Sequence, residues 1–295
     1  MARPLIEPMT LALPHRGKTG RARWAGLRVL HLTDLHVRGP RPRHGRLLDE
    51  LAACDADLVL LTGDYMTKAG DERAALPVLR RVVEALRPRL GLYGVFGNHD
   101  TPAFAEACRA RLPRVRWLGN EAVGAAAGDG RRSGLLAEAG LRLSGLHSLS
   151  TTQPDPVALL ASRAAAWGAG WRRERGAGGN DGLLDLLLSH HPRTLTAAAG
   201  LGVACQFSGH THGGQIRLPG RGSRVLVNSS PLPKPVSSGV LRFRGTRCCV
   251  ARGLGEMTLR LRVCCPPHAP LYTLRVGDPQ TVEHADGGLV RERGW

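Results

Sequence analysis

The residues most able to do chemistry include two histidines, His210 and His212, in the stretch SGHTHGGQ at residues 208–215. Glycine and serine surround them, so an imidazole has few side chains to pack against. A tight loop shaped by glycine is a poor place for a buried histidine and a good place for a metal ligand. The stretch therefore predicts a metal site, provided that the rest of the chain supplies further ligands.

Other candidate ligands stand at the ends of short apolar runs, which have the length and composition of buried strands. The runs cover residues 27–36, 56–65, 91–100, 183–192 and 203–212. The polar residues that end these runs are Asp34, His36, Asp64, Asn98, His190, His210 and His212. The run at 183–192 ends in two histidines, so His190 and His191 are both possible ligands, and we choose His190 because it follows Ser189 directly.

The elements that must position these residues follow from the pattern between the runs. Helical periodicity covers residues 45–54 and 72–87, so strands and helices alternate through the first part of the chain. Such alternation predicts right-handed crossovers and largely parallel strands. Ligand sites in parallel sheets lie beyond the carboxyl ends of the strands, where all the polar clusters fall. The sequence predicts an α/β fold with these clusters side by side.

Carboxylate, imidazole and amide groups together form a ligand set that suits Mn²⁺, Fe, Zn²⁺ or Co²⁺ better than Ca²⁺. The set is too large for one tetrahedral ion and suits two ions that share a bridge. Ordinary structural roles are the alternatives: Asp34 and Asp64 as loop caps, and Asn98 as a turn residue. The histidines could also be ordinary polar loop residues, but their position at separate strand ends makes that interpretation weaker.

The chain length and composition fit a folded protein with a real core. The 295 residues include 42% hydrophobic residues, enough for one large α/β domain or two small ones. The 7 cysteines are an odd number without a regular spacing, which argues against a disulfide scaffold and favours a reducing compartment. We expect one buried thiol from each of the doublets Cys248-Cys249 and Cys264-Cys265, because neighbours on a strand point to opposite faces.

The formal charge of +17 predicts attraction to polyanions such as nucleic acid, anionic lipid or phosphorylated substrates. Arginines are spread along the whole chain, and aromatic residues make up only 4%, so a dedicated nucleic-acid role is possible but not favoured. A basic binding protein without catalysis, for nucleic acid or anionic membrane, is one alternative function. A nuclease is another, and it would need a basic groove, for which Arg172, Arg173 and Arg175 are candidates.

No stretch reaches the roughly 20 apolar residues of a membrane span, and the first residues lack the apolar core of a signal peptide. We expect a cytoplasmic protein, with peripheral attachment to the inner face of the membrane left open. Nothing in the sequence indicates an obligate protein partner. We divide the chain into a lead-in segment (1–26), one domain (27–274) and a tail (275–295). Within the domain, 151–182 is expected to be a surface insertion: a short helix followed by a mobile loop.

The motifs DLH, GD, GNHD, a lone H and GHTH, in this order, resemble the calcineurin-like metallophosphoesterase family over residues 27–274. SGHTHGGQ and the RGLG stretch at 252–255 further resemble a bacterial branch of envelope-associated phosphodiesterases, often described as similar to lipid-precursor hydrolases. The resemblance implies two mixed β-sheets packed as a sandwich and flanked by helices, with the site at the sheet edges. The branch usually has an acidic pair where this chain has HSLSTTQPD, which leaves the substrate pocket open.

The resemblance also implies the roles of individual residues. One metal would be bound by Asp34, His36 and His212, the other by Asn98, His190 and His210, with Asp64 as the bridge. A metal-activated hydroxide would attack the phosphorus, and His99, oriented by Asp100, would protonate the leaving group. The implied function is a dinuclear hydrolase of phosphate esters, with phosphodiesters or lipid-linked phosphates preferred. The remaining histidines His15, His44, His268 and His284 are expected to face solvent or the rim of the site.

Overall fold

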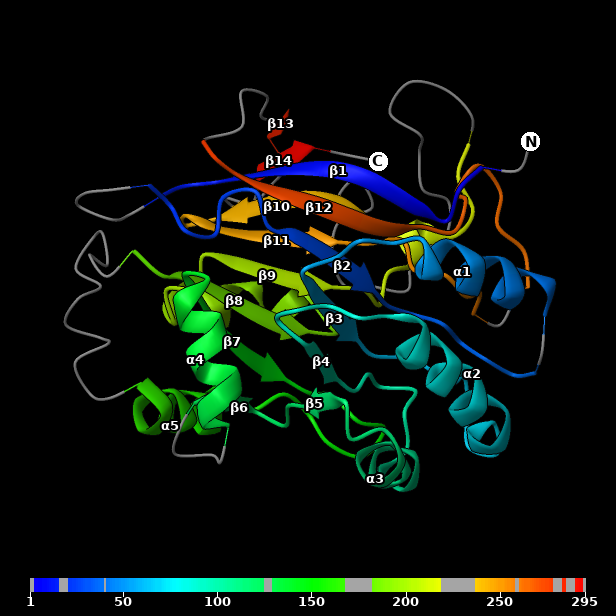
Figure 1. Cartoon of the computed structure of the whole chain (residues 1–295). Coiled ribbons are helices and arrows are strands. Elements are labelled where there is room, and N and C mark those ends of the chain that lie inside the picture. The colour runs from blue at the N-terminus through cyan, green and yellow to red at the C-terminus, as the bar shows by residue number, and fades with distance from the viewer. Residues whose placement is uncertain are drawn as a thin grey trace.

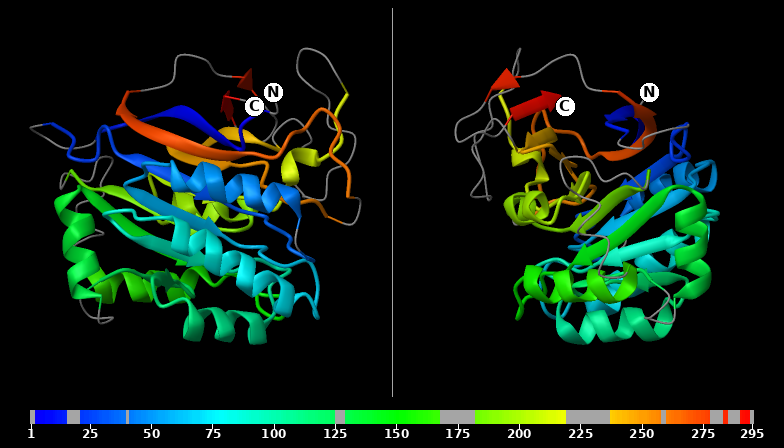
Figure 2. Two further views of the ribbon diagram at one scale, coloured as in Figure 1. Left: turned by 45° about the vertical axis from the view of Figure 1, so that its right-hand side comes forward. Right: turned by 90° about the vertical axis from the view of Figure 1, so that its left-hand side faces the viewer.

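The structure is a computed structural model, and it describes residues 3–15, 21–39, 41–124, 129–167, 182–218, 237–257, 260–277, 283–284 and 290–293. Two mixed sheets form the centre of the described part of the chain, and helices cover their outer faces (Figures 1 and 2). The predicted sandwich of two mixed sheets is confirmed. All five predicted apolar runs form strands, and both predicted helical stretches form helices.

The first sheet has 6 strands in the order β1-β12-β2-β3-β4-β5. Strands β2 to β5 are parallel, as the alternating pattern predicts, while β12 runs antiparallel to β2 and parallel to β1. The bounds are β1 (Ile6–Leu13), β2 (Arg28–Leu32), β3 (Leu58–Thr62), β4 (Leu92–Val95), β5 (Val115–Trp117) and β12 (Ala269–Val276). The segment 1–26 thus contributes strand β1, which pairs with β12 along its whole length.

The second sheet has 8 strands in the order β13-β14-β10-β11-β9-β8-β7-β6. Strands β7, β8, β9 and β11 are parallel, and the outer strands pair antiparallel. The bounds are β6 (Glu121–Ala122), β7 (Leu141–Leu146), β8 (Leu184–Ser189), β9 (Cys205–Ser208), β10 (Gly239–Phe243), β11 (Thr246–Val250), β13 (Glu283–His284) and β14 (Val290–Arg293). The tail after residue 275 therefore adds two short strands to this sheet.

Most of the described helices lie on the outer faces of the sheets, while α4 packs on β7 and its Leu136 joins the core between the sheets. Their bounds are α1 (Pro42–Ala52), α2 (Glu72–Ala85), α3 (Pro102–Arg111), α4 (Gly130–Glu138), α5 (Pro156–Trp167) and α6 (Leu195–Gly200). Helices α1, α2 and α3 follow one another along one flank of the molecule, and α4 and α5 lie together at another (Figures 1 and 2). Helix α5 is the short helix predicted within 151–182, whereas the loop predicted after it falls on 168–181, outside the described residues.

Packing between the sheets explains why the strands are apolar throughout. Leu58 and Leu60 of β3 face Leu186 and Leu188 of β8 in the core between the sheets, while Leu61 packs in a second core beneath α1 and α2. Both faces of a central strand are therefore dry, so its sequence is a continuous apolar run.

The same packing corrects one prediction about the cysteines. Cys248 and Cys249 are both fully buried, because β11 has the other sheet on one face and α6 on the other. The prediction of one buried thiol per doublet is therefore wrong for Cys248 and Cys249. It is right for the second doublet, in which Cys265 is buried and Cys264 is exposed.

Candidate active site

The candidate ligands come from loops that follow the carboxyl ends of five neighbouring strands. Backbone hydrogen bonds continue the parallel pairing of β2 and β3 past the ends of the strands: Asp34 N–H donates to Gly63 O at 3.0 Å, and His36 N–H donates to Asp64 O at 3.0 Å. These bonds hold two of the predicted ligand loops side by side. The sheet edges thus bring together residues that lie far apart in the sequence.

The backbone of these loops is strained at the candidate ligands themselves. Positive φ angles, rare outside glycine, occur at Asp34 (51°), His36 (43°), Asp64 (56°), His210 (69°) and His212 (51°). Each such residue costs on the order of 1–3 kcal/mol and persists only where its surroundings impose it. Strain concentrated at these side chains indicates that the loops are shaped to aim them.

One ligand group consists of Asp34, His36 and His212, all of them buried. Nε2 of His212 lies 3.0 Å from Nε2 of His36 and 3.3 Å from Oδ1 of Asp34. The Asp34 carboxylate also accepts hydrogen bonds from Thr33 Oγ1 at 2.9 Å and from the backbone N–H of His210 at 3.1 Å. These bonds fix the carboxylate while leaving it directed at the two imidazoles.

The other ligand group consists of Asp64, His190 and His210. Nε2 of His190 lies 3.0 Å from Oδ2 of Asp64. Asn98 joins this group through its Oδ1, which lies 3.0 Å from Nδ1 of His210. The structure therefore brings together all the candidate ligands that the sequence predicts.

Asp64 lies between the two groups. Its Oδ2, which is 3.0 Å from Nε2 of His190, is also 3.5 Å from Nε2 of His36 in the other group. A carboxylate that reaches both sets of imidazoles has the position required of a bridging ligand.

The spacing of the donor atoms fits transition-metal ions. Two ligands bound at about 2.1 Å to one ion are about 3.0 Å apart at a right angle and about 3.4 Å apart at a tetrahedral angle. The distances of 3.0, 3.3 and 3.0 Å fall in this range, and the 3.9 Å between Nε2 of His36 and Oδ1 of Asp34 corresponds to a wider angle at the ion. Nε2 of His36 and Nε2 of His212 point at each other across 3.0 Å from two buried rings, as two ligands of one ion would.

His190, and not His191, belongs to the second ligand group. Nδ1 of His190 lies 2.7 Å from the Thr62 carbonyl, which assigns the proton to Nδ1 in the neutral ring and leaves Nε2 as the lone-pair donor. Burial would lower the pKa of His190, but the charge of Asp64 outweighs it and raises the pKa to about 9. The ring of His191 instead packs against His210, with centroids 4.1 Å apart, and burial lowers its pKa to about 2.

His99 lies beside the ligands without belonging to either ligand group. Its ring packs edge-on against His36 with centroids 5.0 Å apart, and its backbone N–H donates to Asp64 Oδ1 at 2.9 Å. Nδ1 of His99 lies 2.6 Å from the Thr67 carbonyl, so Thr67 orients the ring. The family resemblance implied that role for Asp100, but the Asp100 carboxylate accepts hydrogen bonds from backbone N–H groups instead.

Asp100 ties two of the ligand loops together. Its Oδ2 accepts hydrogen bonds from the backbone N–H of Asp64 at 2.9 Å and of Gly97 at 2.8 Å, and its Oδ1 accepts one from Tyr65 N–H at 2.9 Å. Burial, followed by the nearby charge of Asp64, raises the pKa of Asp100 to about 7. Asp100 thus supports the backbone from which Asp64 and Asn98 project.

Glycines allow the loops to approach the Asp34 side chain. A Cβ on Gly253, which has φ +70°, would lie 2.5 Å from Asp34 Cβ, and one on Gly209 would lie 2.2 Å from Asp34 Oδ2. A Cβ on Gly255 would meet the Leu35 carbonyl at 2.4 Å. The RGLG and SGHTH stretches therefore need glycine because they pack directly on the loop that carries Asp34.

Sequence reasoning missed Arg262, which supports His212 from behind. Its guanidinium donates to the carbonyl oxygens of His212, Arg252 and Gly255 and lies 3.4 Å from Nδ1 of His212. A charged residue in the alternating stretch LRLRV normally marks a solvent face, so the sequence carried no signal for this inward position.

Two histidines predicted at the surface or the rim are buried. His44 is 7% exposed and His268 is 1% exposed, so that prediction was wrong for both. Burial lowers the pKa of His44 to about 4 and that of His268 to about 2, so both are neutral near pH 7. His15 is half-buried, and the side chain of His284 lies outside the described residues.

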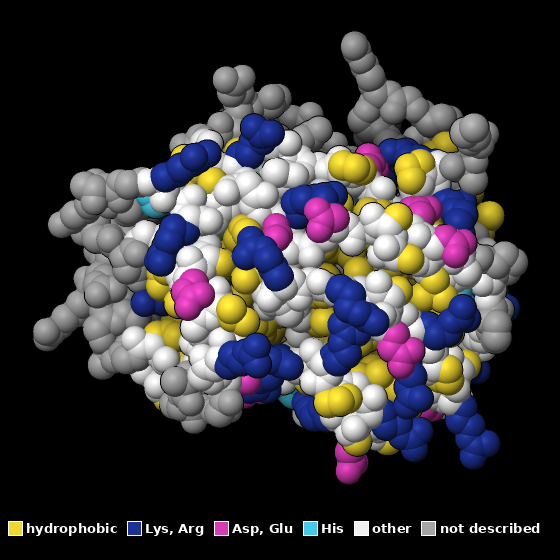
Figure 3. Space-filling view, viewed as in Figure 1, with side chains coloured by type: hydrophobic (Ala, Val, Ile, Leu, Met, Phe, Trp, Pro, Cys, Tyr) yellow, Lys and Arg dark blue, Asp and Glu magenta, His cyan; other side chains and the backbone are white. Residues whose placement is uncertain are grey.

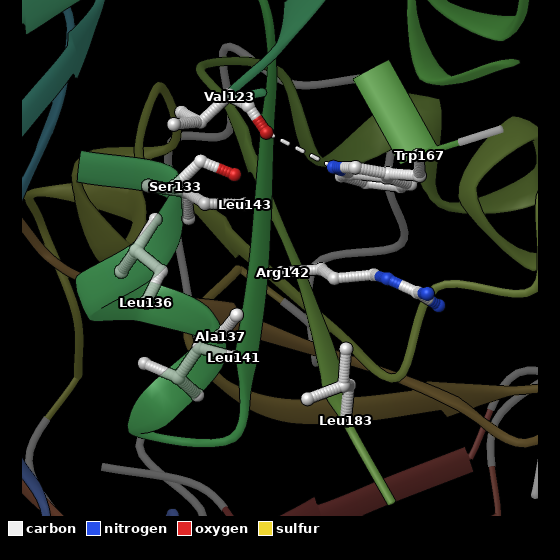
Figure 4. A pocket seen from close by; sticks show the side chains of 9 residues that line it. All are labelled: Val123, Ser133, Leu136, Ala137, Leu141, Arg142, Leu143, Trp167 and Leu183. Carbon is white, nitrogen blue, oxygen red and sulfur yellow. Dashed lines mark hydrogen bonds between the residues drawn. The ribbon is translucent and has the colours of Figure 1, made fainter. Parts of the chain in front are cut away.

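A cavity of about 180 Å³ lies far from the ligands along the strands. It lies between α4, β7 and the Trp167 side chain, whose Nε1 donates to the Val123 carbonyl at 2.9 Å (Figure 4). Leu141 begins β7 and Leu183 precedes β8, so the cavity is at the strand ends opposite to the metal-ligand groups. It takes no part in the chemistry argued above.

Surface charge does not mark one continuous binding groove on the face shown. Lys and Arg side chains are spread over it, with acidic side chains between them (Figure 3). Arg172, Arg173 and Arg175, proposed for a nuclease groove, lie outside the described residues. Among the helices that the structure describes, none combines the length and apolarity needed to cross a bilayer.

Several relatives are similar to this chain over most of its length. An uncharacterised metallophosphoesterase, YkuE of Bacillus subtilis, is 28% identical over 74% of this chain and 68% of its own length. UDP-2,3-diacylglucosamine pyrophosphatase LpxG of Chlamydia trachomatis is 24% identical, with 82% of each chain covered. Phosphodiesterase YaeI of Escherichia coli is 24% identical, with 85% of this chain and 83% of its own length covered.

A model of one protein family covers most of the described site. The calcineurin-like phosphoesterase model matches residues 27–214, which include every candidate metal ligand. The two ligand groups and the mixed sheets that position them agree with this match. The chain therefore belongs to the calcineurin-like phosphoesterases, and it is a metallophosphoesterase that hydrolyses phosphoric esters.

Proposed function

We propose that the protein is a dinuclear metal-dependent phosphoesterase that acts on phosphodiesters or lipid-linked phosphates. The observation that carries the proposal is the Asp64 carboxylate, whose Oδ2 lies 3.0 Å from His190 and 3.5 Å from His36, members of two different ligand groups. Asp34, His36 and His212 would hold one ion, and Asn98, His190 and His210 the other, with Asp64 shared.

Two divalent ions, when bound, lower the pKa of a shared water and neutralise phosphate oxygens. Mn, Fe, Zn and Co all suit this mixed set of oxygen and nitrogen ligands. The chain's own contribution is to hold the ligands with little freedom: Thr62 fixes the ring of His190, and Thr33 fixes the carboxylate of Asp34.

His99 is the residue proposed to protonate the leaving group. The Thr67 carbonyl accepts the Nδ1 proton, so in the imidazolium form of the ring Nε2 carries the proton that would pass to a departing alkoxide. The backbone N–H of His99 donates to Asp64 Oδ1, which places this ring next to the proposed bridge. Positioned proton transfer of this kind contributes typically about 10²- to 10⁴-fold to rate.

The preference for phosphodiesters or lipid-linked phosphates draws support from the relatives. One is named a phosphodiesterase and another a pyrophosphatase of a diacylated sugar nucleotide. Lipid-linked substrates lie in membranes, so the proposal includes peripheral contact with an anionic membrane, in keeping with the charge of +17.

The test combines metal content with a substrate panel. Protein stripped of metal and reloaded with Mn²⁺, Fe²⁺, Zn²⁺ or Co²⁺ should bind close to two ions per chain and hydrolyse bis-p-nitrophenyl phosphate faster than p-nitrophenyl phosphate. A lipid diphosphate and single-stranded DNA complete the panel. At most one ion bound in excess metal would exclude the dinuclear site. Faster turnover of the monoester would contradict the diester preference, and faster turnover of DNA would favour the nuclease alternative.

A further inference from the structure

Two extended segments lie side by side next to the ligand loops and form a small ribbon. Ile216 pairs in parallel with Val263, Arg217 N–H donates to Val263 O at 2.9 Å, and Val263 N–H donates to Gln215 O at 3.0 Å. The first segment follows directly after His212, so the ribbon is continuous with the loop that carries this ligand.

In an ordinary surface strand the polar side chains face solvent and the apolar ones face the protein. In this ribbon the arrangement is reversed. Arg217 is buried and Arg262 is half-buried, while Leu218, Leu261 and Val263 are 45%, 55% and 37% exposed. Alternate residues of an extended chain point to opposite faces. The arginines therefore face the protein, and the aliphatic side chains face outward. We call these outward side chains the aliphatic strip; they are Ile216, Leu218, Leu261 and Val263.

The inward arginines have a clear structural reason. Arg217 Nε donates to the Gly213 carbonyl and its Nη2 donates to Ser238 Oγ, each at 2.6 Å. Arg262 binds the carbonyls of His212 and Gly255. Loop carbonyls around the ligands thus draw both guanidinium groups inward, and the alternation of the chain then directs the neighbouring aliphatic side chains outward.

A basic group of residues adjoins the aliphatic strip. Arg38 donates to Met257 O at 2.7 Å, Met257 N–H donates to Gln215 Oε1 at 2.9 Å, and Gln215 Nε2 donates to Leu261 O at 2.9 Å. This chain of contacts fixes Arg38 next to the strip. Arg38 also interacts electrostatically with the exposed Arg260 and with Arg41.

Acidic residues compensate this basic group only in part. Glu256 forms ion pairs with Arg41 at 2.9 Å and with Arg43, and Asp71 interacts with Arg38 from further along the chain. Among the described residues that these contacts connect, Glu256 and Asp71 face four arginines, which are Arg38, Arg41, Arg43 and Arg260. The rim of the strip carries a net positive charge.

We propose that the aliphatic strip and its arginine rim bind the surface of an anionic lipid bilayer. Isolated exposed aliphatic residues are ordinary, but neighbouring ones bordered by arginines are the composition of surfaces that enter the headgroup region of a membrane. The aliphatic side chains enter the headgroup layer, and the arginines pair with lipid phosphates. A second copy of the chain fits less well, because arginine rims would then face each other.

This surface deepens the function proposed above and rests on it. Arg262, on the inner face of the ribbon, is 3.4 Å from Nδ1 of His212, so a single layer of side chains separates the bilayer contact from the ligand group. A phosphate ester anchored in the bilayer would be held at the edge of the site. The site then selects substrates by where they reside as well as by their chemistry.

Binding to vesicles tests the surface directly. Full-length protein is sedimented with vesicles of phosphatidylglycerol and phosphatidylcholine, or of phosphatidylcholine alone. The test variant is the double substitution Leu218→Ser and Leu261→Ser. The matched control is Val157→Ser with Val276→Ser, since these valines are 76% and 52% exposed and lie on α5 and β12, away from the strip.

We expect wild-type protein and the valine control to bind anionic vesicles, and the leucine variant to bind about 10-fold less or weaker still. Arg260→Gln should weaken binding to anionic vesicles and leave the weak binding to neutral vesicles unchanged. Equal binding by the leucine and valine variants would overturn the proposal. So would a dimer that the leucine substitutions dissociate, because the strip would then be an interface between copies.

Activity separates this proposal from the function on which it rests. The leucine variant should hydrolyse soluble bis-p-nitrophenyl phosphate at the wild-type rate and lose activity only on a vesicle-embedded lipid diphosphate. If the wild-type protein hydrolysed no phosphate ester, the proposed function would be refuted. Vesicle binding would still test the membrane-binding surface. Full activity with no vesicle binding would refute the surface alone.

Discussion

The carboxylate of Asp100 accepts a hydrogen bond from the backbone N–H of Asp64 at 2.9 Å. The same carboxylate binds the N–H groups of Tyr65 and Gly97, so one buried side chain joins the loops after β3 and β4. We therefore expect Asp100 to act through the position of the candidate ligands and not on the substrate.

Replacing Asp100 by alanine should unpair several buried N–H groups. We expect Asp100→Ala to lower the free energy of unfolding by about 2–5 kcal/mol and to reduce metal content. Urea denaturation and metal analysis measure the two effects. Asp155→Ala is a matched control, because Asp155 also accepts from two backbone N–H groups but is exposed, so its removal should cost about 1 kcal/mol. Equal losses in both variants would contradict the buried role of Asp100.

Asp64 is the residue proposed to bridge the two ion positions. Asp64→Ala should reduce the content of both metals and abolish hydrolysis, because its Oδ2 faces imidazoles of both groups. Elemental analysis by mass spectrometry gives the ion count per chain. Asp55→Ala serves as the control, since that carboxylate is 92% exposed and distant from the ligands. Retention of two ions and normal turnover in Asp64→Ala would exclude the bridge.

His99 gives the most discriminating kinetic experiment. His99→Ala should keep both metals and lose about 10²- to 10⁴-fold in turnover on a diester with a poor alkoxide leaving group. The loss should be much smaller on a nitrophenyl ester, which departs without needing a proton. His212→Ala, a ligand substitution, should damage turnover on both substrates together and lose metal. An equal loss on both substrates in His99→Ala would rule out the general-acid role.

Gly253 tests how tightly the RGLG loop packs on Asp34. A Cβ there would meet Asp34 Cβ at 2.5 Å on a backbone with φ +70°. Gly253→Ala should therefore destabilise the protein and weaken metal binding by the group of Asp34, His36 and His212. Gly45→Ala lies in α1 with open space around it and should raise stability by about 0.5–1 kcal/mol. Thermal unfolding of the two variants measures both effects. A Gly253→Ala variant as stable as the wild type would be incompatible with this packing.

His31 predicts a pH dependence of stability. It is fully buried, its Nε2 lies 2.7 Å from Thr62 Oγ1, and burial lowers its pKa to about 3. Below its ordinary pKa of 6.5 the unfolded chain binds a proton that the folded chain does not. The free energy of unfolding of metal-free protein should thus fall as pH drops from about 6.5 to 3, by at most about 1.4 kcal/mol per pH unit from this group.

His31→Gln removes the pH-dependent contribution of His31 to the free energy of unfolding and keeps a polar partner for Thr62. The stability advantage of the wild type over His31→Gln should therefore shrink as the pH falls below 6.5, which urea titrations at several pH values would show. His190 acts in the opposite direction, because its pKa is raised to about 9: its contribution to stability is fully present below pH 6.5 and is lost as the pH rises from there through about 9. A difference between the two proteins that does not vary with pH would refute the prediction.

The sequence predicted the strands and their polar ends because both depend on local composition. A strand buried on both faces must be apolar, and parallel strands end at the same edge, so Asp34, Asp64 and His190 could be placed together from the pattern alone. The sequence left His190 and His191 both possible and favoured His190 by its position after Ser189, whereas the structure distinguishes them by contacts: Thr62 orients His190, and His191 packs against His210.

Other features depend on tertiary contacts that no local pattern records. The positive φ angles at His36 and Asp64 are imposed by neighbouring loops, although glycine is the residue that normally signals them. Arg262 points inward because carbonyls from separate loops converge on it, so its place in LRLRV gave a misleading solvent-face pattern. His268 is buried for a similar reason: its segment packs against Gly253.

Strand β12 lies between β1 and β2, although it is made last of the three. During synthesis on a ribosome, β1 therefore has no neighbour to pair with until residue 276 has left the exit tunnel. The parallel strands β2 to β5 can assemble much earlier, because each adds beside the one before it. Strand β1 is therefore unpaired while β2 to β5 assemble. Truncation before β12 should therefore leave both β1 and the edge of β2 open to aggregation.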